Sequence, residues 1–244
     1  MVERELARSD PEPHLRGPML RLLRFPTLHA FALFLGLAAS CQAPWRELPL
    51  DEEHWQSVSF GGEGEVEFGA DGVLMRFGSP LTGVRWTGDE LPAAYEIEVR
   101  AVRLDGNDFF CGLNLPIGPD AATVVLGGWG GALCGLSCID GMDASMNATR
   151  SFQNFERGRA HLLRVRVDGR QVAATVDGIE LFQHTRGEGA LSLRTEVEPV
   201  GRLGLTCFQT SARIEAVRWR PLTARGAASR ASGCSHGIGR SCSP

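Results

Sequence analysis

The sequence contains no lysine, so its 25 basic residues are all arginine, and they are outnumbered by 29 acidic residues. Exclusive use of arginine is typical of codon bias in a GC-rich genome. The formal net charge is -4, and no block of arginines is interleaved with stacking aromatics. The electrostatic footprint of a nucleic-acid-binding protein is therefore missing, which excludes DNA and RNA as expected partners.

Long apolar runs and helical periodicity are absent as well. The apolar run from Ala30 to Ala39 is too short for a membrane-spanning helix, which needs about 20 apolar residues. From Trp55 onward, no segment is long and periodic enough to form a core helix, and no internal repeat occurs. Helical bundles and repeat folds are therefore excluded.

Several catalytic motifs are also lacking. The sequence has no Gly-x-Ser-x-Gly, no His-Glu-x-x-His and no phosphate-binding loop. Closely spaced acids on one strand, as in retaining β-glucanases, are absent too. Ordinary two-carboxylate glycoside hydrolysis is therefore not supported by the sequence.

The first part of the sequence has the order of an export signal. Three arginines between residues 14 and 24 precede a mostly apolar stretch from Phe25 to Ser40. Small residues then lead into Cys41, which resembles a bacterial lipoprotein signal with Cys41 as the lipidated residue. The alternative is an ordinary cleaved signal that ends near Ala43. Both predict an exported protein: a periplasmic protein, an outer-membrane-anchored lipoprotein or a cell-surface protein. A lipid anchor, which only the lipoprotein signal supplies, would be its only contact with a membrane. Residues 1–41 are therefore the targeting segment.

The rest of the chain divides into one domain and a tail. Residues 46–221 are apolar enough to form a core, since 43% of the whole sequence is hydrophobic and only 22% is charged. Residues 222–244 consist largely of Arg, Ala, Ser and Gly without periodicity, which is typical of a disordered tail. Four of the seven cysteines lie in the domain, and we interpret them as small buried hydrophobic residues rather than as a metal site.

Alternation with period two is the dominant pattern of the domain. Apolar and charged residues alternate from Tyr95 to Ala101 and from Leu163 to Asp168, which predicts strands with one dry and one wet face. The pairs Asp168-Gly169 and Asp177-Gly178 supply the positive φ angles of type I′ hairpins, so residues 160–184 form a three-stranded meander. Further strands are expected at 64–68, 72–77, 108–115, 121–127, 132–138, 203–208 and 212–219.

These short strands predict an all-β protein, an antiparallel jelly-roll sandwich. Period two also predicts which side chains share one core. They are Ile97, Val99, Leu163, Val165, Val167, Val172, Ala174 and Val176.

Four stretches together carry a family resemblance: Tyr95 to Arg100 (YEIEVR), Gly106 to Leu113 (GNDFFCGL), Gly127 to Gly131 (GGWGG) and Val176 to Gly178 (VDG). They resemble the concanavalin A-like lectin and glucanase jelly rolls. Within that group the chain is similar to the 3-keto-disaccharide hydrolase family, also described as 3-keto-glucoside lyases and 2-hydroxyglucal hydratases. The resemblance covers about residues 54–220 and implies cleavage of 3-keto-glycosides. Many family members carry Asn-Ser-Gly where this chain has Asn107-Asp108-Phe109.

Such chemistry needs a base, because a ketone at sugar carbon 3 acidifies the proton on carbon 2. Asp108 precedes two phenylalanines, where a partly desolvated carboxylate would be suited to proton transfer; the alternative is that it caps a turn. Asp140 and Asp143, followed by Asn147, suit either a sugar or a hard divalent cation. The alternative for this loop is a turn whose side chains satisfy local backbone groups.

Aromatic and amide groups give the expected carbohydrate-binding set. Trp129 stands among four glycines, where its ring is free either to stack on a sugar or to fold into the core. Trp86 with Arg85 is a second candidate pair, and Asn107 and Asn147 complete the set.

Two hypotheses follow. The first is an exported enzyme that uses Asp108, Asp140 or Asp143 as acid-base groups. The second is a non-catalytic, lectin-like carbohydrate-binding module at the cell surface. A groove lined by two or more of these carboxylates would favour the enzyme. A shallow face with an exposed Trp129 and no paired acids would favour binding, and a structural surface protein is the third reading.

Overall fold

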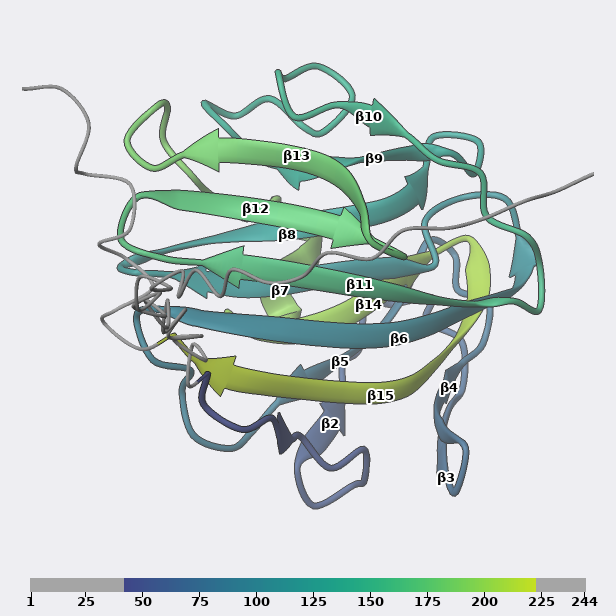
Figure 1. Ribbon diagram of the computed structural model, residues 1–244. Helices are drawn as coiled ribbons and strands as arrows, with labels where there is room; N and C mark the ends of the chain where they lie inside the picture. The colour runs from purple at the N-terminus through teal and green to yellow at the C-terminus, as the bar shows by residue number, and fades with distance from the viewer. Residues whose placement is uncertain (1–41, 223–244) are drawn as a thin grey trace, which may run out of the picture. The chain divides into compact units, whose positions relative to one another are not determined.

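The computed structural model describes residues 42–222, which form two antiparallel β-sheets and one short 3-10 helix (Figure 1). The targeting segment, Cys41 and the predicted tail beyond residue 222 lie outside the described residues. Among the described residues, no helix is long and apolar enough to cross a membrane. The expected all-β, two-sheet architecture is confirmed.

The first sheet has eight strands. Seven run in the order β13-β12-β11-β6-β15-β4-β3, and β1 pairs with the end of β15. Their bounds are β1 Arg46–Glu47, β3 Val66–Gly69, β4 Gly72–Met75, β6 Tyr95–Gly106, β11 Ala160–Val167, β12 Gln171–Val176, β13 Ile179–Thr185 and β15 Thr210–Pro221.

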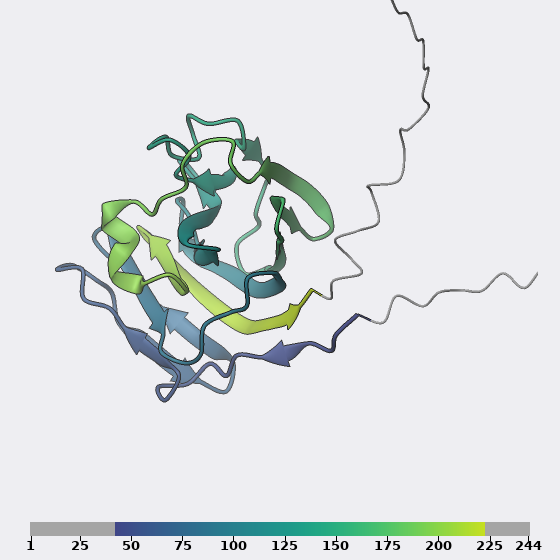
Figure 2. The same ribbon diagram turned by 90° about the vertical axis from the view of Figure 1, so that its left-hand side faces the viewer.

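The second sheet has seven strands in the order β10-β9-β8-β7-β14-β5-β2. Their bounds are β2 Trp55–Ser57, β5 Leu81–Trp86, β7 Cys111–Ile117, β8 Asp120–Gly128, β9 Leu133–Ser137, β10 Ser151–Phe152 and β14 Gly204–Phe208. The 3-10 helix η1, Thr195–Val200, lies beside β14 and β5 (Figure 2).

The core between the sheets is built from alternate residues of the strands. All eight side chains that the sequence assigns to one core belong to it, and each is at most 1% exposed. From the facing sheet, Leu113, Val124 and Leu205 join the same core. Each fully buried aliphatic side chain contributes roughly 1.5–3 kcal/mol to the free energy of folding. The shared period-two pattern therefore accounts for much of the hydrophobic stabilisation of the sandwich.

The predicted meander is present, but one of its two turns differs from the prediction. Asp177 and Gly178 have φ angles of 50° and 81°, as a type I′ turn requires. The type I′ prediction for Asp168-Gly169 is wrong, because neither residue has a positive φ angle. Asp168 instead accepts the N–H groups of Arg170 and Gln171, so its side chain closes a longer loop.

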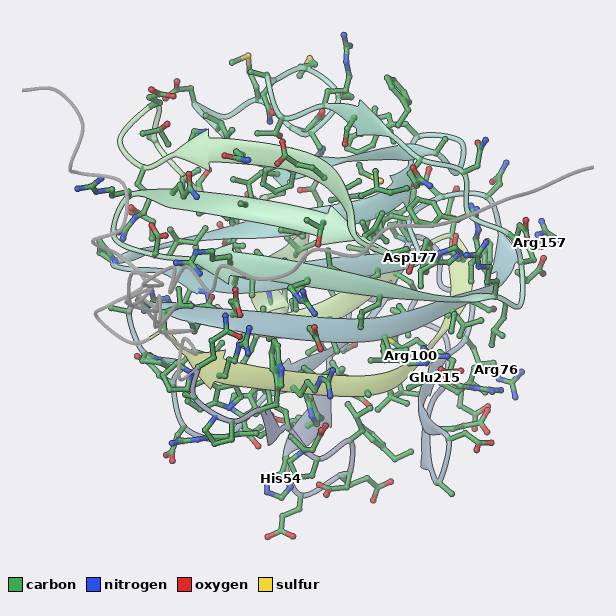
Figure 3. The ribbon with its side chains drawn as sticks, in the orientation of Figure 1. His54, Arg76, Arg100, Arg157, Asp177 and Glu215 are labelled. Atoms are coloured by element: carbon green, nitrogen blue, oxygen red, sulfur yellow. The ribbon has the colours of Figure 1, made fainter. Side chains whose placement is uncertain are left out.

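The prediction of a wet face for Glu96 and Glu98 is also wrong. These side chains are 8% and 1% exposed, although they point away from the core. Arg164 and Arg218 form ion pairs with Glu98 from β11 and β15, the strands on either side of β6, and these pairs offset the cost of burying its charge. Near the middle of β6, Arg100 forms a more exposed ion pair with Glu215 of β15 (Figure 3).

The four domain cysteines, Cys111, Cys134, Cys138 and Cys207, are buried and free. Burial raises the pKa of the Cys111 and Cys207 thiols to about 12 and that of Cys134 to about 11. These thiols are therefore neutral, and their expected role as small buried hydrophobic residues is confirmed.

Candidate functional site

The outer face of the seven-stranded sheet carries the candidate site. Strand register places Ser137, Thr123, Asn114 and Gly204 in one row across β9, β8, β7 and β14. Their chain neighbours Leu136, Val124, Leu113 and Leu205 point into the core. Because side chains alternate along a strand, the row faces away from the core.

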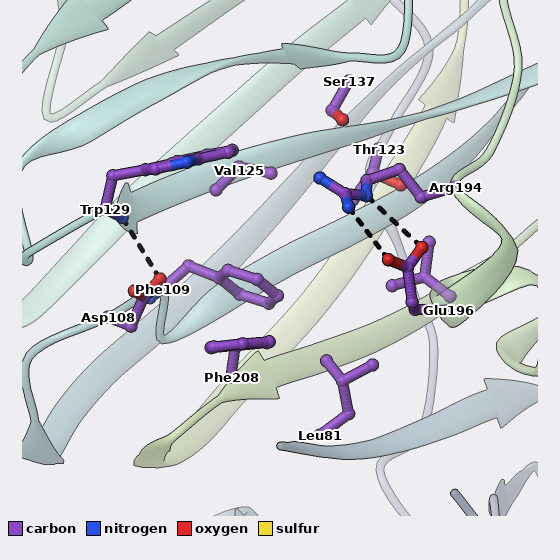
Figure 4. Close-up of a pocket in the computed structure, with 11 residues that line it drawn as sticks. Leu81, Asp108, Phe109, Thr123, Val125, Trp129, Ser137, Arg194, Glu196 and Phe208 are labelled. Atoms are coloured by element: carbon purple, nitrogen blue, oxygen red, sulfur yellow. Dashed lines mark hydrogen bonds and ion pairs between the residues drawn. The ribbon is translucent and has the colours of Figure 1, made fainter. Parts of the chain in front are cut away.

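A pocket of about 410 Å³ opens on this face (Figure 4). Val125 and Thr123 of β8 contribute to it, and Phe109 packs against Phe208 with ring centroids 5.6 Å apart. The full set of lining residues is Leu81, Asp108, Phe109, Thr123, Val125, Trp129, Ser137, Arg194, Glu196, Val197 and Phe208. The pocket thus joins apolar surface to a few polar groups, as small-molecule sites do.

Trp129 forms one side of the pocket and is 45% exposed. It lies in the connection between β8 and β9, with a φ angle of 47° that L-residues rarely adopt. Its backbone N–H donates to Asp108 Oδ1 at 3.2 Å. The turn therefore holds the ring at the pocket rather than folding it into the core.

Asp108 lies beside Trp129 and also lines the pocket. Its Oδ1 accepts the N–H of Phe109 at 2.8 Å as well as that of Trp129. Its own N–H donates to Thr210 Oγ1. Asp108 therefore fixes the turn while presenting its carboxylate to the pocket, so the two alternatives left open by the sequence coexist in one side chain.

Arg103 supports the same turn from behind, and the sequence reasoning missed it. It is 6% exposed and donates to the carbonyl oxygens of Gly131 and Phe155. Its guanidinium lies over the Phe110 ring, 5.5 Å from the centroid, and burial lowers its pKa. Gly131 has a φ angle of 102°, which favours glycine, and a Cβ there would lie 2.7 Å from Arg103 Nη1. The available signal was an arginine at an inward-facing position of the strand that starts at Tyr95.

Arg194 and Glu196 form the opposite side of the pocket (Figure 4), and the sequence reasoning missed both. Arg194 Nη2 lies 2.8 Å from Glu196 Oε1, and Nε lies 3.3 Å from Oε2. Arg194 Nη1 contacts Asp143 Oδ2 at 3.2 Å. Hydrogen bonding to Arg194 lowers the pKa of Glu196, so Glu196 is ionised at neutral pH.

The loop that contains Asp140, Asp143 and Asn147 is held mainly by its own side chains. Asp143 Oδ1 accepts the N–H and the hydroxyl of Ser145, and Asp140 Oδ1 accepts the N–H of Ala190. Asn147 is 8% exposed, and its amide donates to three carbonyl oxygens. Asp143 therefore reaches the pocket only through Arg194. No three His, Cys, Asp or Glu side chains gather as a metal site within residues 42–222.

Three other candidates lie outside the pocket lining. Arg85 donates to Gln56 Oε1, and Trp86 donates from Nε1 to the carbonyl oxygen of Asp89. The Trp86 ring also packs edge-on against Trp55. Asn107 is exposed in the connection between β6 and β7, next to Asp108.

No protein-family model matches the sequence, and no curated protein sequence matches it. Solved structures do share its fold. One is the apo Crh5 transglycosylase, with a TM-score of 0.51 and 11% identity, covering 74% of this chain and 84% of that one. Another is the exoplasmic/lumenal domain of VIP36 in its Ca2+/Man3GlcNAc-bound form, with a TM-score of 0.50 and 11% identity, covering 73% and 88%. The predicted antiparallel jelly-roll fold is confirmed, whereas neither of these structures supports the finer resemblance to 3-keto-disaccharide hydrolases.

Proposed function

We propose that this domain is a lectin-like module that binds carbohydrate in the pocket between Trp129 and Arg194. The observation that carries the proposal is the placement of Trp129. Its ring is 45% exposed beside the pocket although the turn that holds it is strained. Strained backbone of this kind concentrates at functional sites, which fits a ring held out for a ligand.

The remaining lining suits a sugar. The C–H face of a sugar ring can lie against Trp129, while Phe109 and Val125 supply further apolar contact. Sugar hydroxyls can donate to the carboxylates of Asp108 and Glu196. The volume of about 410 Å³ falls within the usual range of ligand pockets. The two solved structures named above are a transglycosylase and a domain with a bound glycan, which supports the same class of ligand.

The test is a glycan-binding screen followed by calorimetric titration of the best ligand. Trp129→Ala should weaken binding at least tenfold, because alanine cannot replace the stacked ring. Phe152→Ala is the matched control, since Phe152 is 68% exposed and lies outside the pocket lining. Unchanged affinity in Trp129→Ala, or no glycan bound by the wild-type chain, would refute the proposal.

Cleavage of 3-keto-glycosides is the second candidate, favoured by one observation. Asp108 and Glu196 bring two carboxylates to the same pocket, on opposite sides of it (Figure 4). Asp108 would remove the proton on sugar carbon 2, and the Arg194 guanidinium would offset the charge that develops on the enolate. Collapse of the enolate would then break the bond between carbon 1 and the glycosidic oxygen, which would leave as an alcohol after taking a proton from water. Release of product from a 3-keto-glucoside tests this candidate. Asp108→Asn should lower the rate about 10²- to 10⁴-fold, and absence of turnover by the wild-type chain would eliminate it.

We also propose export with a lipid anchor at Cys41, on the basis of the targeting segment alone. Palmitate labelling in the native host should then occur and should be lost in Cys41→Ser. Unlabelled wild-type protein would leave the ordinary cleaved signal as the better description.

A further inference from the structure

The charges that face the pocket narrow the class of ligand, an inference that rests on the proposed carbohydrate binding. Three lining side chains carry charge: Asp108, Arg194 and Glu196. A fourth, Asp143, contacts Arg194 from outside the lining. The set therefore holds three carboxylates and one guanidinium, an excess of negative charge.

The single cation is already committed to protein partners. Each of the three guanidinium nitrogens of Arg194 faces a carboxylate oxygen: Nε and Nη2 face Glu196, and Nη1 faces Asp143. Two carboxylates thus share one positive charge. Three of the five N–H groups of Arg194 are therefore taken up, and its positive charge is already offset by two carboxylates, which weakens the contact by which arginine holds a ligand carboxylate, sulfate or phosphate.

The other polar groups of the pocket mainly accept hydrogen bonds. The backbone N–H groups of Phe109 and Trp129 both donate to Asp108 Oδ1, and no group among residues 42–222 donates to Asp108 Oδ2. Thr123 donates its hydroxyl proton to Asn114 Oδ1, and the Ser137 hydroxyl lies 3.4 Å from Cys138 Sγ. A ligand therefore meets carboxylate oxygens ready to accept, and few donors.

We infer that the pocket selects an uncharged sugar and discriminates against uronic acids and sulfated sugars. The hydroxyls of a neutral sugar are donors that match Asp108 and Glu196. An acidic group in the same place would lie beside like charges without a free cation. Such juxtaposition of like charge is an effective way to reject a wrong ligand.

The experiment screens the exported chain against neutral glycans and against uronate- and sulfate-containing glycans at low salt. The best neutral binder is then compared with the same glycan after oxidation of its primary hydroxyls to carboxylates. The two glycans differ only at carbon 6, where a charged carboxylate replaces a neutral alcohol, and the salt dependence isolates the effect of the charge. The oxidised glycan should bind at least tenfold more weakly, and added salt should reduce the difference because it screens repulsion.

A charge variant makes the test specific to the pocket. Glu196→Gln removes one like charge and leaves one acceptor oxygen where Glu196 offers two to Arg194 Nε and Nη2, so it should reduce the preference for the neutral glycan several-fold. Glu67→Gln is the matched control, because Glu67 also forms an exposed ion pair, with Arg76, but lies on β3 outside the pocket lining. It changes the net charge equally and should leave the preference unchanged.

The outcomes separate this inference from the function on which it rests. Oxidised glycan bound as tightly as its neutral parent, or a screen dominated by acidic glycans, overturns the inference but leaves carbohydrate binding in place. Equal effects of Glu67→Gln and Glu196→Gln also overturn it, because the preference would then reflect net charge alone. A chain that binds no glycan of either class overturns the proposed function as well.

Discussion

Trp129 has a strained backbone and a large, partly exposed ring, and replacing it with glycine or with alanine separates the effects of the two on stability. Its backbone has a φ angle of 47°, which costs a non-glycine residue roughly 1–2 kcal/mol. Its ring is 45% exposed, so truncation removes only part of the roughly 1.5–3 kcal/mol that full burial of a large apolar side chain contributes. The lost packing should therefore cost about 1 kcal/mol in either variant.

The two variants should nevertheless differ in stability. Trp129→Ala keeps the strain and should be about 1 kcal/mol less stable than the wild type. Trp129→Gly relieves the strain, since glycine adopts positive φ freely, and should lie within about 0.5 kcal/mol of the wild type after its larger unfolded-state entropy is included. Both should lose glycan affinity, because neither has the ring.

Urea unfolding followed by far-ultraviolet circular dichroism measures the difference without relying on tryptophan fluorescence. For a domain of this size, 1 kcal/mol corresponds to roughly 2–4 °C in melting temperature. A loss of about 3–5 kcal/mol in Trp129→Ala would show that the ring is a core side chain. Trp129→Gly being less stable than Trp129→Ala would refute the strain argument.

Three further predictions concern other parts of the domain. Hydrogen bonds from backbone N–H groups, that of Glu63 itself foremost and then those of its loop neighbours, together with one from the Ser59 hydroxyl, lower the pKa of Glu63 from 4.5 to about 2. The contribution of Glu63 to the free energy of unfolding should be present above pH 4.5 and lost as the pH falls towards 2. Glu63→Gln should remove this pH-dependent contribution, and a variant whose stability falls with acid as that of the wild type does would contradict this. Arg103→Met should destabilise the domain by about 1–3 kcal/mol and weaken glycan binding, because the Gly131 carbonyl loses its donor; a variant of unchanged stability and affinity would contradict this. Cys111 and Cys207 should resist iodoacetamide at pH 8 in the folded protein and react in urea, as peptide mass spectrometry would show; native labelling would contradict their burial.

Period-two patterns predicted the strands and the shared core because burial on one face imposes that period directly. The same rule failed for Glu96 and Glu98, since it assigns outward positions to solvent. Arginines on the two strands that flank β6 form ion pairs with Glu98, and they come from positions 164 and 218, far away in sequence. Local alternation cannot register such long-range pairing.

The site shows the same division between local and distant information. Consecutive antiparallel strands lie side by side, so the sequence could predict that Asp108 and Trp129 meet. The hydrogen bond between them joins the connection before β7 to the connection after β8. The other side of the pocket comes from a segment that is distant in sequence from Asp108 and Trp129. The segment after β13 leaves the first sheet, carries Arg194 and Glu196, and enters β14, which inserts between β7 and β5. Because β14 pairs with strands that occur much earlier in the chain, the rule that consecutive strands lie side by side does not lead to Arg194. In the sequence, Arg194 and Glu196 are two opposite charges two residues apart, as on many protein surfaces. Only the fold places them across the pocket from Trp129.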